Sequence, residues 1–152
     1  MKGFFYNLKA KRIKPTHTYD NTLINELNQE HEKLFIIYDK IIETYISKKY
    51  RKTLKYLKKF YETYHLHILK EDNQLYNYLK TKYKFFPEIK EQITQKQEEM
   101  KKITLKLEEF ILKYNNIKTI QENNKFLKEL GEIGKALTER VKFEETKLYD
   151  KY

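Results

Sequence analysis

The amino-acid sequence predicts an all-α fold, an antiparallel up-down-up-down four-helix bundle. The 152 residues include only three glycines and two prolines, too few for the many turns of a β fold. Apolar residues also recur at alternating spacings of three and four along four long stretches, which is typical of helices that bury one face. The connections between these stretches are short, so consecutive helices should be antiparallel neighbours.

The first helix is expected over about residues 20–48, after a basic and aromatic extension over residues 1–18. Pro15 lies near the end of that extension and a capping position near Asp20 starts the helix, so the bundle domain is placed at 19–152. One face of this helix should be buried. Its members are Ile24, Leu27, His31, Leu34, Tyr38, Ile41 and Tyr45.

The second helix is expected over about residues 51–83 and carries two polar residues, His67 and Glu71, on the face that should be buried. Phe86-Pro87 ends the pattern, because proline disfavours helix in the residue before it and suits the first turn of a new helix. The expected buried face comprises Leu57, Phe60, Tyr64, His67, Glu71, Leu75 and Tyr78.

The third helix is expected over about 87–114 and the fourth over about 120–150, with an Asn-Asn turn signal at 115–116. Gly131 and Gly134 lie inside the fourth helix, where each costs about 1 kcal/mol relative to alanine. We therefore expect a close helix contact or a bend there. The expected buried residues are Ile89, Ile93, Gln97, Met100, Ile103, Leu107, Phe110 and Tyr114 in the third helix and Phe126, Leu130, Ile133, Leu137, Arg140, Glu144 and Leu148 in the fourth.

Counting along antiparallel helices places the buried polar residues of three helices at one depth. His31 lies about seventeen residues before the end of its helix, and a similar count into the next helix reaches His67. The same count back from the end region of the chain falls near 136–144, which contains Arg140 and Glu144. One polar layer is therefore expected within the apolar core.

A short internal repeat joins the second and fourth helices. Residues 67–76 and 140–149 both read X-x-x-x-E-[DE]-x-x-L-Y, where X is His67 in the first and Arg140 in the second. The i, i+4 spacing stacks X and the glutamate on one helix face. Buried ionised carboxylates are costly unless they are paired or metal-bound, so Glu71 and Glu144 require a cation between them.

These motifs resemble the hemerythrin-like (HHE cation-binding) family over roughly residues 19–152. The residues that carry the resemblance are 29–34, 67–76 and 144–149. Members of that family are four-helix bundles that hold two non-heme irons. The resemblance implies that His31 and His67 match terminal metal ligands. It also implies that Glu71 and Glu144 match the bridging carboxylates.

The chain departs from the family pattern at the second iron. Arg140 stands where the fourth helix should supply a histidine. The core positions of the third helix at this level are Gln97, Met100, Ile103 and Thr104, and none is a good iron ligand. In the family, the histidines of the first two helices serve one metal and those of the last two serve the other. The resemblance therefore implies one metal ion, iron, manganese or zinc, and no diiron centre.

Two interpretations of the polar layer stay open. In the first, one metal is held by His31, His67, Glu71 and Glu144, and the guanidinium of Arg140 occupies the place of the missing metal. The protein would then bind or sense a metal ion. In the second, no metal binds, and Arg140 with a protonated histidine balances the two glutamates as a structural ionic core.

A second resemblance supplies a different class of function. Residues 130–145 are similar to the matching helix of the regulator-of-sigma-D anti-sigma family, through the pattern Ile-Gly-x-Ala-Leu-x-x-Arg-x-x-x-Glu, with the arginine included. It implies a metal-free regulatory bundle that acts through its surface, on an acidic protein partner such as a sigma factor or another regulator.

Composition excludes several other classes. The chain has no cysteine, so thiolate metal sites and disulfides are absent. No Ser-His-Asp set or phosphate loop is present, and we expect no enzyme activity. The net charge of +10 is spread over all helices among glutamates, which does not favour nucleic-acid binding. A weaker alternative is nucleic-acid or membrane-surface binding through the basic extension. No apolar run or signal peptide is found, so we expect a cytoplasmic protein without a membrane span.

Overall fold

The computed structural model describes residues 18–152, and all regular structure in that part of the chain is helical. The all-α prediction is confirmed. The predicted N-terminal extension, apart from Thr18, lies outside the described residues. No helix among residues 18–152 has both the length and the apolar character needed to cross a membrane.

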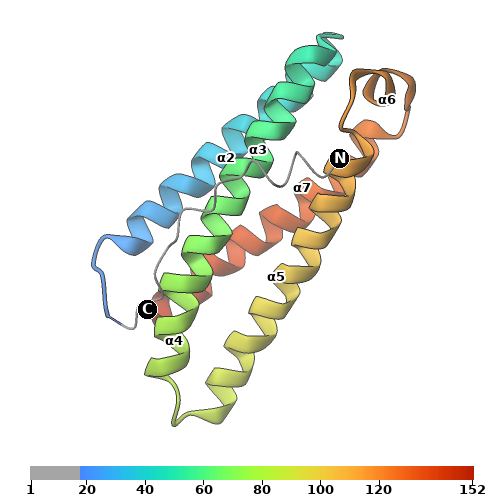
Figure 1. The fold of residues 1–152 in the computed structure, drawn as a ribbon. Coiled ribbons are helices and arrows are strands. Elements are labelled where there is room, and N and C mark those ends of the chain that lie inside the picture. Colours follow the sequence, from blue (N-terminus) through green and yellow to red (C-terminus); the bar gives the residue numbers. More distant parts are fainter. Residues whose placement is uncertain (1–17) are drawn as a thin grey trace.

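The long helices lie side by side along one common direction (Figure 1). In that view α2 climbs, α3 and α4 return beside it, α5 climbs again, and α7 runs back toward the C-terminus. The bounds are α2 Leu23–Ile46, α3 Tyr50–Lys70, α4 Asn77–Lys82, α5 Pro87–Lys113, α6 Ile117–Glu122 and α7 Phe126–Phe143.

The fourth long helix starts later than predicted, because a separate short helix, α6, occupies the N-terminal end of the expected one. The side chain of Asn116 caps α6 by accepting a hydrogen bond from the backbone N–H of Thr119 at 2.9 Å. Asn123 then takes an extended backbone conformation, with φ −101° and ψ 110°, which ends α6. The long helix α7 starts only at Phe126. The other three long helices begin and end within a few residues of the expected positions.

Two π-helical turns interrupt the helices at equivalent places in the internal repeat. The first, η1, spans Glu71–Tyr76 and joins α3 to α4. The second, η2, spans Glu144–Leu148, follows α7, and leads into the 3₁₀ turn η3, Tyr149–Lys151. The backbone N–H of Tyr149 bonds the carbonyl of Glu144, five residues earlier, which is the π pattern. Each turn therefore holds one residue more than an α turn.

The π turns change which residues are buried. In η1 the adjacent residues Leu75 and Tyr76 are both buried, and Leu79 follows them. Tyr78, which the α-helical repeat placed in the core, is only half-buried.

The buried face of α2 is also turned slightly from the predicted one. Ile37 is buried and Tyr38 lies at the edge of that face.

The core consists of two apolar clusters with polar residues between them. One cluster is built around Leu34, Phe60, Leu107, Phe126 and Leu130. The other cluster comprises Leu23, Leu27, Leu75, Tyr76, Leu79, Ile93, Leu148 and Tyr149. The residues that separate them along the chain are polar but equally buried, and they form the candidate site.

The two glycines of α7 have different surroundings. A Cβ atom at Gly134 would overlap the hydroxyl oxygen of Tyr38, so the close helix contact expected there is present. Tyr38 donates a hydrogen bond to the carbonyl of Leu130 at 3.0 Å across this contact. Among residues 18–152, nothing lies within 4 Å of a Cβ atom placed at Gly131, which is exposed, so of the two glycines only Gly134 makes the expected close contact.

Candidate metal centre

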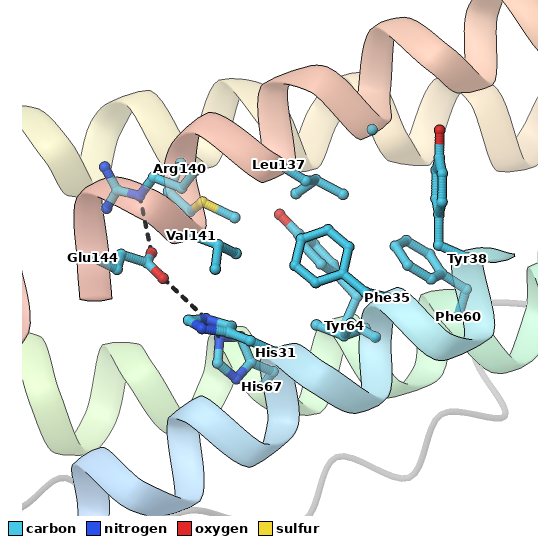
Figure 2. Close-up of a pocket in the computed structure, with 13 residues that line it drawn as sticks. His31, Phe35, Tyr38, Phe60, Tyr64, His67, Leu137, Arg140, Val141 and Glu144 are labelled. Atoms are coloured by element: carbon cyan, nitrogen blue, oxygen red, sulfur yellow. Dashed lines mark hydrogen bonds and ion pairs between the residues drawn. The ribbon is translucent and has the colours of Figure 1, made fainter. Parts of the chain in front are cut away.

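Five polar side chains from five elements meet in the layer between the two apolar clusters. Figure 2 shows His31, His67, Arg140 and Glu144. His31 comes from α2, His67 from the last turn of α3, and Arg140 from the last turn of α7. Glu71 and Glu144 are the first residues of η1 and η2. None of the five is more than 5% exposed. The structure thus brings together every residue that the sequence placed in the polar layer.

Four of these side chains direct one ligand atom each toward a common point. The chosen atoms of His31, His67, Glu71 and Glu144 all lie within 4.8 Å of one another. The Nε2 atoms of the two histidines are 3.1 Å apart. Glu144 Oε2 lies 3.1 Å from Nε2 of His31, and Glu71 Oε2 lies 2.9 Å from Nε2 of His67. This donor set of two imidazoles and two carboxylates suits iron, manganese or zinc.

Each histidine is oriented by a carboxylate on its other ring nitrogen. Nδ1 of His31 lies 3.1 Å from Oε1 of Glu145, and Nδ1 of His67 lies 2.9 Å from Oε1 of Glu30. Lys70 donates to the second oxygen of Glu30 at 3.0 Å. Such carboxylate–histidine pairs select the tautomer whose Nε2 atom is free to bind a metal.

The two orienting glutamates were not predicted from the sequence. Glu30 precedes His31 and Glu145 follows Glu144, so both fall outside the strict helical stripe of buried positions. Each reaches the histidine of another helix, not of its own. For Glu145 the available signal was the acidic residue that follows each glutamate of the internal repeat, to which the pattern assigned no role. Glu30 lies outside that repeat.

Tyr149 also belongs to this layer and was not predicted. Its hydroxyl oxygen lies 3.3 Å from His31 Nε2, 3.2 Å from Glu71 Oε2 and 3.4 Å from Glu144 Oε2. Its ring is stacked on that of His31, with centroids 5.9 Å apart and planes 9° from parallel. The side chain is 6% exposed.

Arg140 lies on the far side of Glu144 from the histidines (Figure 2). Its Nε donates to Oε1 of Glu144 at 2.9 Å, and its Nη2 donates to the hydroxyl of Tyr76. Its Nη1 has no hydrogen-bond partner among the described residues. Arg140 therefore neutralises one of the two buried carboxylates from the side opposite the histidines.

The face of α5 toward the layer offers no metal ligand among the described residues. Gln97 is half-buried and donates from Nε2 to Oδ1 of Asp72 at 2.9 Å. Met100 lines the cavity beside the layer, and Thr104 bonds the hydroxyl of Tyr64 at 2.8 Å. Asp72 is the repeat counterpart of Glu145, so its bond to Gln97 corresponds to the bond between Glu145 and His31.

The electrostatics of the layer favour proton or metal binding at its centre. Burial opposes the charged form of His67, but Glu71 and Glu30 outweigh it and raise its pKa to about 10. Burial and the nearby Glu144 raise the pKa of Glu71. For Glu144 burial acts in the same direction, but His31 and Arg140 outweigh it and lower its pKa. The pKa values of the two carboxyl groups thus shift in opposite directions, because His31 and Arg140 stabilise the charged form of Glu144 while burial and Glu144 oppose that of Glu71.

One carboxylate oxygen in the layer is left without a protein partner. Oε1 of Glu71 is buried and accepts no hydrogen bond from the residues described. A buried carboxylate oxygen that is not hydrogen-bonded is costly, and a metal ion is one group that would satisfy it. The residues present therefore fit a single bound metal ion.

A small cavity adjoins the ligand atoms. About 20 Å³ of it is open to the centre of a water-sized molecule, which is room for about one water. His31, His67 and Glu144 stand at one end, and the remaining wall is mostly apolar, with Leu34, Phe35, Leu137 and Val141 (Figure 2). The hydroxyls of Tyr38 and Tyr64 bond protein groups, the carbonyl of Leu130 and the hydroxyl of Thr104.

A family model described as the hemerythrin HHE cation binding domain matches residues 22–152. No curated protein and no solved structure matches the chain significantly.

Proposed function

The chain belongs to the hemerythrin HHE cation-binding family, and on that premise we propose that it binds one metal ion in a binding or sensing role. The ligands are His31, His67, Glu71 and Glu144. The metal is iron, manganese or zinc, the protein acts in the cytoplasm, and it is not an enzyme.

The observation that carries the proposal is the arrangement of the two histidines. Both direct Nε2 to the point where Glu71 and Glu144 also converge, and both have Nδ1 engaged by a carboxylate. An ion pair alone would not need two imidazoles that both direct Nε2 to the centre while a carboxylate holds Nδ1. Metal ligation does need this, because the orienting carboxylate fixes the ring and increases its basicity.

Arg140 supports a single metal over a pair. A second metal on the far side of Glu144 would stand beside a permanent positive charge 2.9 Å from that carboxylate. On the facing helix Gln97 is bonded to Asp72 and offers only an amide. Oxygen carriage by the two-electron chemistry that needs both irons is therefore not proposed.

The cavity supports a sensing role. It ends at the ligand atoms and has room for about one water-sized molecule. A mostly apolar wall favours a small, weakly polar ligand such as dioxygen or nitric oxide. Iron supply itself is a second signal that a reversible one-metal site reports.

Elemental analysis of protein purified without chelators or affinity tags tests the proposal. We expect about one iron, manganese or zinc per chain in the wild type, and its loss in His67→Ala. The matched control is His65→Ala, which removes a half-buried imidazole two residues away and should keep the metal. A wild-type protein that is metal-free and cannot be loaded anaerobically with ferrous iron would refute it.

The alternative is a metal-free regulatory bundle that binds an acidic protein such as a sigma factor. The ion pairs of Arg140 with Glu144 and of His67 with Glu71, each at 2.9 Å, favour it because they balance charge without a metal. The net charge of +10 suits an acidic partner. This alternative predicts that metal-free protein forms a stoichiometric complex with the purified housekeeping sigma factor. Absence of that complex would count against it.

A further inference from the structure

We propose that the phenol oxygen of Tyr149 is a fifth ligand of the bound metal ion. The inference rests on the proposed function, since it concerns the same metal. It adds an anionic oxygen to the two imidazoles and two carboxylates, and it makes the site one that favours a ferric ion.

The position of the Tyr149 hydroxyl is the first argument. It lies within 3.4 Å of one ligand atom each from His31, Glu71 and Glu144. These three residues come from three different segments of the chain. The hydroxyl therefore faces the shared centre of the ligand set and not the edge of one member.

The spacing of the five atoms is the second argument. Two ligands bound at about 2.1 Å from a metal lie about 3.0 Å apart at a right angle and about 3.4 Å apart at the tetrahedral angle. Three pairs among the His and Glu ligand atoms measure 2.9, 3.1 and 3.1 Å. The three distances from Tyr149 are 3.2, 3.3 and 3.4 Å. These six distances fall in the range expected between neighbouring ligands of one metal ion.

The local backbone explains why this tyrosine reaches the centre. In an α-helix the residue stacked below Glu144 would be Leu148, four positions later. The π turn η2 bonds the N–H of Tyr149 to the carbonyl of Glu144 instead, and Tyr149 takes up the position below the ligand.

Tyr76 holds the corresponding place in η1 but has a different partner. Its hydroxyl accepts from Nη2 of Arg140. The two halves of the repeat therefore differ in their tyrosines as well as in having His67 or Arg140 at the first position. One faces the metal position and the other faces the guanidinium that replaces the second metal.

Ligation converts the phenol to a phenolate. The O–H bond breaks, the proton leaves to solvent, and the oxygen lone pair forms the bond to the metal, so charge and atoms balance. A bound cation supplies the electrostatic drive for this loss, as it does for other metal-bound groups. A third anionic oxygen beside Glu71 and Glu144 stabilises a trivalent ion more than a divalent one.

The test uses iron as the probe. Full-length protein is loaded anaerobically with ferrous iron, freed of excess metal, and oxidised with ferricyanide, which accepts one electron per iron. We expect a visible phenolate-to-iron charge-transfer band, with phenolate ring modes in the resonance Raman spectrum excited in that band. Tyr149→Phe should lose both, and Tyr76→Phe, the matched control from the repeat, should keep both. Circular dichroism melts establish that each variant is folded.

The outcomes separate the two proposals. If about one iron per chain binds but the ferric wild type shows no such band, the fifth ligand is refuted and the metal site stands. A band that persists in Tyr149→Phe refutes the fifth ligand in the same way. If no iron binds to the wild type, both proposals fail together. If Tyr149→Phe does not fold, the Raman spectrum of the wild type decides.

Discussion

His31 and His67 point their Nε2 atoms at each other across the contact of α2 with α3, 3.1 Å apart. At that separation only one of the two nitrogens can carry a proton toward the other. Each ring is held by a carboxylate from another element, since Glu30 of α2 orients His67 and Glu145 of η2 orients His31. The metal position is thus defined by groups that each depend on a neighbouring helix.

Removing an orienting carboxylate should weaken metal binding without removing a ligand. We expect Glu145→Gln and Glu30→Gln each to lower affinity for zinc or manganese by about 10–100-fold, because the imidazole loses its fixed tautomer and part of its basicity. Competition with a chromophoric chelator measures this. Glu32→Gln, an exposed position on α2, is the control and should bind as the wild type does. Equal affinities in all four proteins would contradict the role assigned to Glu30 and Glu145.

The repeat predicts how a second metal position can be built. Arg140→His restores the fourth-helix imidazole, and Gln97→His puts an imidazole where Asp72 already accepts a bond. We expect the double variant to bind about two irons per chain, and either single variant to stay at about one. Iron analysis after anaerobic loading decides. One iron per chain in a folded double variant would show that Arg140 and Gln97 are not the residues that exclude the second metal.

The metal-free protein should lose stability as the solution becomes alkaline. The pKa of His67 is raised to about 10 in the fold, against about 6.5 in an unfolded chain, so the folded state binds its proton more tightly. That contribution is fully present below about pH 6.5 and is lost as the pH rises through about 10. The raised pKa of Glu71 acts in the same direction at lower pH, because the fold favours its neutral form.

Urea denaturation at pH 6 and pH 9 measures this loss, which we expect to reach a few kcal/mol, at about 1.4 kcal/mol per pKa unit. Saturating zinc should reverse the trend, since binding needs a neutral imidazole and tightens with pH. His67→Gln should flatten the metal-free pH dependence. A metal-free protein that is equally stable at both pH values would contradict the charge state assigned to His67.

The two glycines of α7 should respond to alanine in opposite directions. Gly134→Ala places a methyl group against the Tyr38 hydroxyl, closer than van der Waals contact allows, so we expect destabilisation by about 1–3 kcal/mol. Gly131→Ala meets open space and should stabilise the helix by about 0.5–1 kcal/mol. Thermal unfolding of the two variants side by side checks this. A stabilised Gly134→Ala would show that Tyr38 moves aside freely.

Helical periodicity was enough to predict the bundle and the polar layer, because His31, His67, Arg140 and Glu144 all keep the spacing of an α-helix. It was not enough to find Tyr149. An α-helical count places Leu148 below Glu144, and only the π turn brings in the next residue. Glu30 and Glu145 were not predicted for another reason. They lie at the border of the buried face, and their function depends on which helix stands beside them, which a single-helix pattern does not contain.

The start of α7 shows a similar limit. The fourth helix was expected from about residue 120, although its expected buried face begins at Phe126. Ile120 and Phe126 are both buried, but they lie on two separate helices. The break comes from the side-chain cap of Asn116 and the extended backbone at Asn123, which are local choices that periodicity does not record.

The π turns determine the orientation of the residues that follow them in the chain. An α-helix rotates by about 100° per residue, so a helix that relaxed from π to α at η1 or η2 would turn everything beyond it by about that angle. Leu79 would leave the apolar cluster that it forms with Leu23, Leu75 and Ile93, and Tyr149 would leave the polar layer. The positions of the side chains around a bound ion therefore depend on the π conformation of η1 and η2. A change in the winding of either π turn would therefore alter the polar layer and the packing of the helix beyond it together.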